Sequence, residues 1–211
     1  METVSEIAAD EVAETAQPSL GWKEGDRVFR ILMWVPVFFL PLPVPGLGTP
    51  PDFVGWLIAL GGLMSVSGPD VRPMRRVVQL GLALSVARIA LVVGGTSSTL
   101  HLGLYFIGSA AAAVLVVLAG GLAAEMARAA DNAAFAGTAE SHRWLFVIHP
   151  AVPALAAVVF RLTQGGLAGL LLAYVPLFLD ACLIYAVMRI MERASRLCRK
   201  QQMTGETGQA D

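Results

Sequence analysis

Hydrophobic positions along the chain gather into long runs, and the length of these runs predicts membrane-spanning helices. A helix rises about 1.5 Å per residue, so crossing a hydrocarbon core of about 30 Å takes some 17 to 25 apolar residues. Six runs have this length, at residues 31–47, 53–69, 77–95, 101–124, 144–160 and 167–188. The pattern predicts an all-α fold, a polytopic transmembrane helical bundle of about six spans in three hairpins.

Prolines leave two alternatives for the first hairpin. The stretch VFFLPLPVPGLGTPPDF, residues 37–53, contains five prolines. Proline lacks a backbone donor and clashes with the preceding turn, so the first helix is expected to end near Leu40 or to continue in broken form. Residues 31–69 then form either two full spans or a short re-entrant hairpin, and both return the chain to the same side.

The basic residues predict the orientation of the chain. Of the fifteen Lys and Arg residues, thirteen lie in segments that a six-span chain starting in the cytoplasm keeps inside. The predicted outer loops hold only Arg161, while Arg88 lies within a span. By the positive-inside rule, this distribution predicts a multi-pass protein of the cell membrane with both termini in the cytoplasm.

Composition supports the membrane interpretation and suggests three segments. Hydrophobic residues make up 56% of the chain and charged residues only 15%, against about 25% charged in a typical soluble domain. Residues 1–27 are expected to form a mobile acidic cytoplasmic tail, residues 28–192 the membrane helical bundle, and residues 193–211 a basic-to-polar cytoplasmic tail. Within the bundle, the Ala-rich segment 125–143 is a candidate interfacial helix.

Arg88 and Asp180 are charged residues inside predicted spans, and each lies on a helix face of small residues. Small residues let helices approach closely in a bilayer, so both faces are expected to point into the bundle. The residues expected to make helix contacts, including one Gly-x-x-x-Gly pair, are Gly81, Ser85, Gly95, Gly165, Gly169 and Ala173.

Depth along the helices suggests that Arg88 and Asp180 form a pair. Arg88 lies about 18 Å beyond Arg76, and Asp180 lies about 14 Å before Arg189, so the two charges have similar depth. A charge near the bilayer centre costs roughly 3 kcal/mol, which favours pairing if the two helices are neighbours. His149, about 9 Å from the same face, adds a third titratable group.

Two interpretations of these three residues remain open. In the functional one, Asp180 accepts a proton or cation, Arg88 is its counter-charge or an anion site, and His149 is a relay along a polar path. In the structural one, Arg88 and Asp180 form a buried pair that fixes helix register, and His149 is a core histidine.

Catalytic and metal-binding motifs are absent from the sequence. There is no His-Glu-x-x-His motif, no Gly-x-Ser-x-Gly elbow and no phosphate-binding loop, and Cys182 and Cys198 are expected to be packing or free thiols. The chain resembles no known family, and we expect no enzyme activity, catalytic residue, metal or cofactor. Expected partners are the lipid bilayer and a second copy or a membrane-complex subunit, but not nucleic acid.

The sequence thus predicts a small transporter or permeation protein with an intramembrane Arg/Asp site. The alternative is a non-catalytic membrane subunit or scaffold of a larger complex. A third class is an intramembrane enzyme with an unfamiliar motif.

Overall fold

The computed structural model describes residues 19–39, 52–95, 98–152 and 166–207, together with positions 155, 158, 159 and 162. All elements in this part of the chain are helical, and no strand occurs among these residues, so the predicted all-α class is confirmed for them. In chain order the elements are α2 (Trp22–Trp34), the 3-10 helix η1 (Val35–Phe39), α3 (Asp52–Met64), α4 (Val71–Val93), α5 (Ser98–Ala129), α6 (Ala133–Arg143), the 3-10 helix η2 (Leu145–Ala151) and α8 (Leu167–Thr207).

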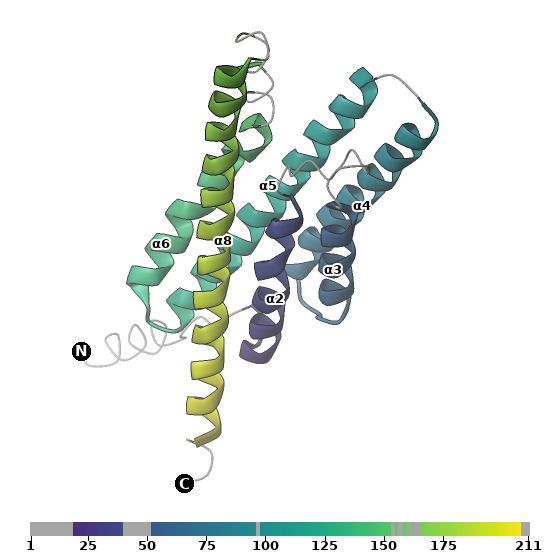
Figure 1. The fold of residues 1–211 in the computed structure, drawn as a ribbon. Helices are drawn as coiled ribbons and strands as arrows, with labels where there is room; N and C mark the ends of the chain where they lie inside the picture. Colours follow the sequence, from purple (N-terminus) through teal and green to yellow (C-terminus); the bar gives the residue numbers. More distant parts are fainter. Residues whose placement is uncertain are drawn as a thin grey trace, which may run out of the picture.

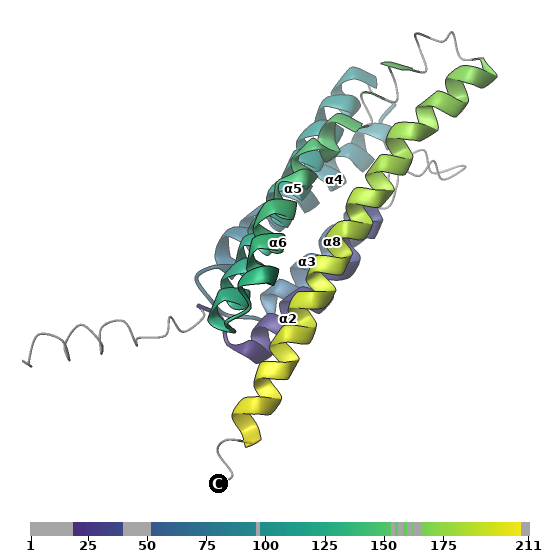
Figure 2. The ribbon, with the colours of Figure 1, turned by 90° about the vertical axis from the view of Figure 1, so that its left-hand side faces the viewer.

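The helices form an elongated bundle in which α5 is central (Figures 1 and 2). α5 packs against α4, α6, η2 and α8, while α2 packs against α3 and most extensively against α8. α4 and α8 lie on different sides of α5 and have no substantial contact with each other.

Two helices within the described residues are long and apolar enough to cross a membrane. These are Gly103–Ala129 in α5 and Tyr174–Gly205 in α8. The 13 residues of α3 extend only about 20 Å, less than the roughly 30 Å of a hydrocarbon core. The second half of the predicted fifth span is described only at isolated positions. The six-span count is therefore not confirmed.

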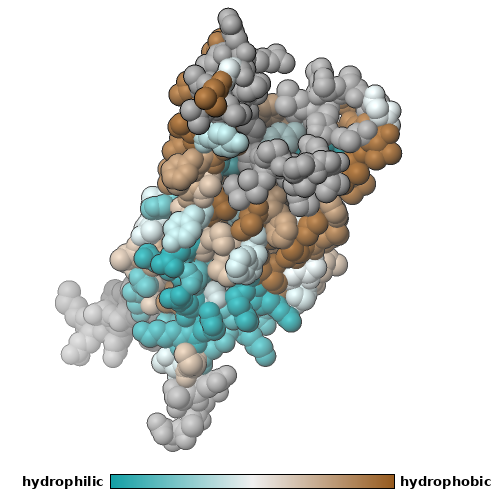
Figure 3. Space-filling model, viewed as in Figure 1, coloured by the Kyte–Doolittle hydropathy of each residue, from teal (hydrophilic) through white to brown (hydrophobic). Residues whose placement is uncertain are grey.

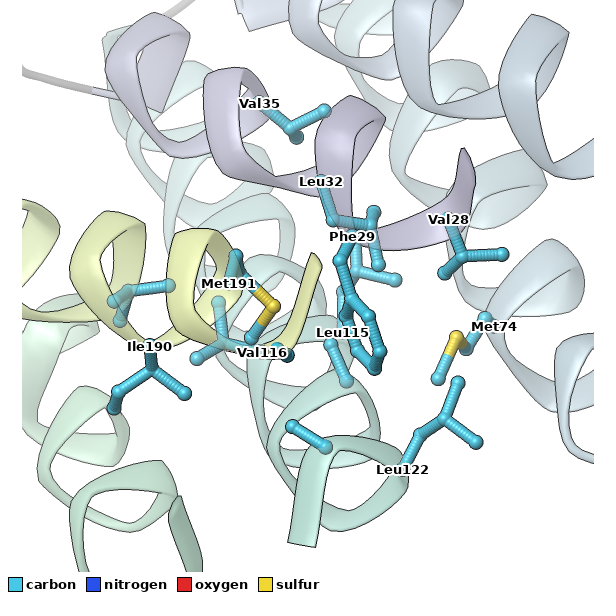
Figure 4. Close-up of a cluster of buried hydrophobic side chains, with 14 of the residues drawn as sticks. Val28, Phe29, Leu32, Val35, Met74, Leu115, Val116, Leu122, Ile190 and Met191 are labelled. Carbon is cyan, nitrogen blue, oxygen red and sulfur yellow. The ribbon is translucent and has the colours of Figure 1, made fainter. Parts of the chain in front are cut away.

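A hydrophobic core lies between α2, α4, α5 and α8. α2 is amphipathic: Lys23, Glu24, Arg27 and Arg30 are exposed, while the opposite face is buried. Burying one large apolar side chain contributes about 1.5 to 3 kcal/mol, so this face holds α2 against the bundle. The core residues labelled in Figure 4 are Val28, Phe29, Leu32, Val35, Met74, Leu115, Val116, Leu122, Ile190 and Met191.

The surface divides into a polar half and an apolar half (Figure 3). The polar half contains the start of α2, α6 and the end of α8. The apolar half exposes large side chains from several helices, as a lipid-facing surface requires. Among them are Leu80, Val86, Ile89, Ile107, Val114, Val175, Phe178 and Leu179.

Helices extend into both predicted tail segments. α2 begins at Trp22, within residues 1–27, and α8 continues to Thr207, within residues 193–211. The two helices meet around Asp26, which is 4% exposed. The Ser195 hydroxyl donates a hydrogen bond to Asp26, and Arg199 Nε lies 3.4 Å from Asp26 Oδ1.

The predicted interfacial segment 125–143 is two helices joined by a turn. α5 ends at Ala129, and α6 begins after Asn132, whose side-chain oxygen accepts a hydrogen bond from the Phe135 amide at 3.1 Å. Such an N-cap satisfies a backbone donor that the first helical turn leaves unpaired. α6 then packs back along α5.

Candidate functional site

A group of polar side chains lies within the apolar half, and we call it the buried polar cluster. Five elements contribute to it: α3, α4, α5, η2 and α8. Its members are Asp52, Ser85, Arg88, Tyr105, His149 and Asp180.

Asp52 is the first residue of α3, and its carboxylate is fully engaged. Oδ1 accepts a hydrogen bond from the Phe53 amide at 3.0 Å and lies 3.0 Å from Arg88 Nη2. Oδ2 accepts a hydrogen bond from the Ser85 hydroxyl at 2.9 Å. An acidic residue at a helix N-terminus is also stabilised by the helix dipole. Because the Arg88 side chain is only 3% exposed, this salt bridge supplies the counter-charge that a buried guanidinium needs.

His149 and Asp180 form the second charged contact of the cluster. His149 Nδ1 lies 2.5 Å from Asp180 Oδ1, and the two side chains are 1% and 0% exposed. The imidazole also stacks on Phe146, with ring centroids 4.6 Å apart. This contact and the stacking on Phe146 fix the orientation of the imidazole ring.

The 3-10 conformation of η2 brings His149 to the depth of Asp180. A 3-10 helix rises about 2.0 Å per residue, so six residues from Arg143 to His149 cover about 12 Å instead of the 9 Å expected for an α-helix. That is close to the roughly 14 Å between Asp180 and Arg189. Pro150 lies inside η2 and cannot donate a backbone hydrogen bond, which disfavours a regular α-helix there.

Tyr105 of α5 lies between the two charged contacts. The Arg88 guanidinium carbon is 5.2 Å from the centre of the Tyr105 ring, within the range of a cation–π interaction. Tyr105 also interacts electrostatically with both Asp52 and Asp180. The hydroxyl lies near Ser109 but makes no hydrogen bond of good geometry among the described residues.

A small cavity connects the two contacts. The volume open to the centre of a water molecule is about 10 Å³, so the cavity can hold about one water. Its lining includes apolar residues and four polar ones: Asp52, Tyr105, Ser109 and His149.

Four buried polar atoms of this cluster have no hydrogen-bond partner among the described residues. They are Arg88 Nε, Arg88 Nη2, Tyr105 Oη and Asp180 Oδ2, although Arg88 Nη2 keeps its ionic contact with Asp52. Leaving a buried polar group unsatisfied costs about 1 to 3 kcal/mol, so native proteins normally supply water or a ligand at such atoms. The cluster therefore offers two guanidinium donors, a phenol that can donate or accept, and one carboxylate acceptor to a small molecule or ion.

The expected pair of Arg88 and Asp180 does not form, although the structure buries both residues together with His149. Arg88 lies on α4 and Asp180 on α8, and α5 separates these helices. Arg88 is paired with Asp52 instead, and Asp180 with His149.

The small-residue positions predicted for helix packing have different outcomes. Ser85 is buried and bonds to Asp52, and a Cβ atom on Gly81 would collide with the ring of Trp56, so α3 and α4 meet closely there. Gly95 follows the end of α4 with a positive φ of 66°, and no atom of the described residues lies within 4 Å of the place where a Cβ would be. Glycine adopts this backbone conformation without strain.

The remaining packing predictions cannot be followed in the structure. Gly165 lies outside the described residues, and so do the side-chain surroundings of Gly169 and Ala173.

Asp52 is the member of the cluster that the sequence interpretation missed. It follows Pro50 and Pro51 and directly precedes the predicted span 53–69. A signal was present, because an acidic residue directly before an apolar run, after proline, is typical of a helix N-terminus.

The comparisons add no relative to this description. No protein-family model, curated protein or solved structure matches the chain. Within the described residues, no group of three or more His, Cys, Asp and Glu side chains is placed to hold a metal ion.

Proposed function

We propose that this protein is a small multi-pass transporter or permeation protein of the cell membrane, whose path for a small ion or solute passes the buried polar cluster. The observation that carries the proposal is the cluster itself. Five elements bring two carboxylates, a guanidinium, an imidazole and a phenol together inside the half of the molecule with an apolar surface. Buried charges at membrane depth cost roughly 3 kcal/mol each, and in membrane proteins they commonly mark ion paths.

Several features support a membrane location. Only 33% of the most apolar 18-residue stretch of α8 is buried, whereas the core helix of a soluble protein is mostly buried. The large side chains of this stretch are therefore available to lipid. Apart from Arg88, the described bases lie on α2, at the start of α4, at the ends of α5 and α6, and in the second half of α8. This arrangement agrees with the positive-inside rule for a polar half in the cytoplasm.

The contact between the start of α2 and the end of α8 supports placing both termini on one side. Asp26 and Ser195 meet in the polar half, although they are 169 residues apart in sequence. For residues 31–69, the length of α3 favours the re-entrant hairpin over two full spans. α3 starts at Asp52 beside Arg88, which is about 18 Å above Arg76, and returns to the polar half within 13 residues.

A flux measurement on the purified full-length protein in liposomes tests the proposal. Charge movement is recorded on a solid-supported membrane after concentration jumps of protons, Na⁺, K⁺ and Cl⁻. We expect a current for at least one ion that is lost in Asp180→Asn. It should be retained in Glu192→Gln, a matched carboxamide substitution in the polar part of the same helix. Currents equal to those of protein-free liposomes for every jump would refute the transport proposal.

A second candidate function, a membrane subunit that recruits a partner, is favoured by one feature of the polar half. An open groove of about 450 Å³ lies between α6 and α8, and three bases line it: Arg193, Arg196 and Lys200. An acidic partner segment would complement this charge. If this function holds, Arg193→Glu with Lys200→Glu should release the protein from a larger complex on a native gel of its own membrane, without changing its abundance.

A further inference from the structure

The carboxylate of Asp180 differs from that of Asp52 in one respect: one of its two oxygens is unsatisfied. Both oxygens of Asp52 have partners, supplied by a backbone amide, a hydroxyl and a guanidinium. Asp180 uses only Oδ1, and its Oδ2 has no partner among the described residues although the side chain is completely buried. The second contact therefore has unused capacity at its carboxylate.

We infer that the buried polar cluster binds and releases a proton at the His149–Asp180 pair, so that the proton is the ion this site carries. The inference rests on the proposed transport function and specifies its substrate. The other titratable and charged groups facing the pair are Asp52 from α3, Arg88 from α4 and Tyr105 from α5.

Charge counting supports a single proton. The charges of Arg88 and Asp52 cancel, which leaves the Asp180 carboxylate and the imidazole of His149. With a neutral imidazole the cluster has a formal charge of −1, and with an imidazolium it is neutral. Desolvation penalises the charged state of a buried cluster, so uptake of one proton removes the net charge from the apolar half.

The cavity is too small to hold a transported solute much larger than a water molecule. His149 lines it, and Nδ1 of the ring is occupied by Asp180, which leaves Nε2 as the nitrogen that can exchange a proton. The cavity has room for about one water molecule, too little for an organic solute in this conformation.

The proton step is simple to write. A hydronium ion in the cavity donates a proton to Nε2: one O–H bond breaks, one N–H bond forms, and a neutral water molecule remains. The positive charge then rests on the imidazolium, which the Asp180 carboxylate faces. Release reverses these changes.

The decisive experiment measures proton uptake into liposomes that contain the full-length protein and the trapped pH dye pyranine. A K⁺ gradient with valinomycin sets a membrane potential that drives protons inward. We expect wild type and Glu192→Gln to acidify the lumen at the same rate, and Asp180→Asn and His149→Gln to be at least ten-fold slower at equal protein incorporation.

The outcomes separate this inference from the transport proposal. If Na⁺, K⁺ or Cl⁻ jumps give currents that depend on Asp180 while proton uptake equals that of empty liposomes, the transport proposal stands and the proton inference is wrong. If no ion moves, the transport proposal itself fails.

A measurement on the wild-type protein tests the proton inference even if the variants do not fold. Infrared difference spectra of protein with ¹³C-labelled aspartate carboxyls and ring-labelled histidine are recorded through a pH titration in liposomes. We expect coupled changes in a buried histidine band and a carboxylate band, with slow hydrogen–deuterium exchange. If no buried histidine changes protonation at any pH at which the protein stays folded, the proton inference is wrong.

Discussion

Replacing Asp52 with asparagine removes the charge that faces Arg88 while preserving the shape of the side chain. In Asp52→Asn the guanidinium stays buried, at 3% exposure, without its counter-charge. Breaking a buried ion pair by removing one partner costs about 3 to 5 kcal/mol. Because asparagine can still accept the Ser85 hydrogen bond and Asp52 is 14% exposed, we expect the lower end, about 3 kcal/mol of unfolding free energy.

A double-mutant cycle isolates the pair from these other contacts. Arg88→Met removes the charge but keeps a long apolar side chain, so Asp52→Asn combined with Arg88→Met leaves no buried charge at this contact. We expect the double variant to be more stable than the sum of the single effects predicts, by about 2 kcal/mol, since residues in direct contact couple by 0.5 to 3 kcal/mol.

Reversible unfolding in mixed micelles, followed by tryptophan fluorescence, measures these free energies. Trp56 is 1% exposed and lies on the same helix as Asp52, so its emission reports the packing of α3. The matched control is the cycle of Arg88→Met with Asp180→Asn, which we expect to show less than half the coupling because each residue has another partner. Stronger coupling of Arg88 to Asp180 than to Asp52 would refute the assigned pairing.

Two further predictions concern packing and thiol chemistry. Gly81→Leu should lower the unfolding free energy of the reconstituted protein by about 1 to 3 kcal/mol, as is typical of overpacking, because a Cβ there collides with Trp56. In Gly103→Leu the added Cβ meets no atom of the described residues, so the melting temperature should stay unchanged. Burial and nearby Asp26 raise the pKa of the Cys198 thiol, in the polar end of α8, to about 12. Little thiolate then exists at pH 8, so a small maleimide should label Cys198 only on unfolding, as peptide mass mapping would reveal. Labelling of native Cys198 at the rate of a free thiol would contradict this.

The run lengths in the sequence were sufficient to predict the helical class, and the small-residue faces were sufficient to select the buried charges. Arg88, Asp180 and His149 are all buried in the structure, as expected for charges that cannot face lipid. Partner assignment failed because depth is a one-dimensional measure. Residues at the same depth meet only if their helices are neighbours. No sequence pattern predicted that α4 and α8 both pack against α5 and not against each other.

Asp52 was missed for a related reason. In a six-span arrangement the start of the second span lies at the outer surface, where an aspartate is unremarkable. In a re-entrant arrangement the same residue lies at the depth of Arg88, where it needs a partner. Its role therefore depends on the fold of the first hairpin, which the prolines of residues 37–53 left open.

The two carboxylates of the cluster are held in different ways, and the proton inference assigns them different roles on that ground. Asp52 is fixed by three contacts, one of them to its own helix, so protonating it would weaken all three at once. Asp180 is held by a single titratable partner, and its other oxygen is unsatisfied, so changing the protonation state of that pair disturbs one contact. In the inferred proton site, the contacts of Asp52 therefore hold Arg88 in place, while proton exchange is confined to the His149–Asp180 pair.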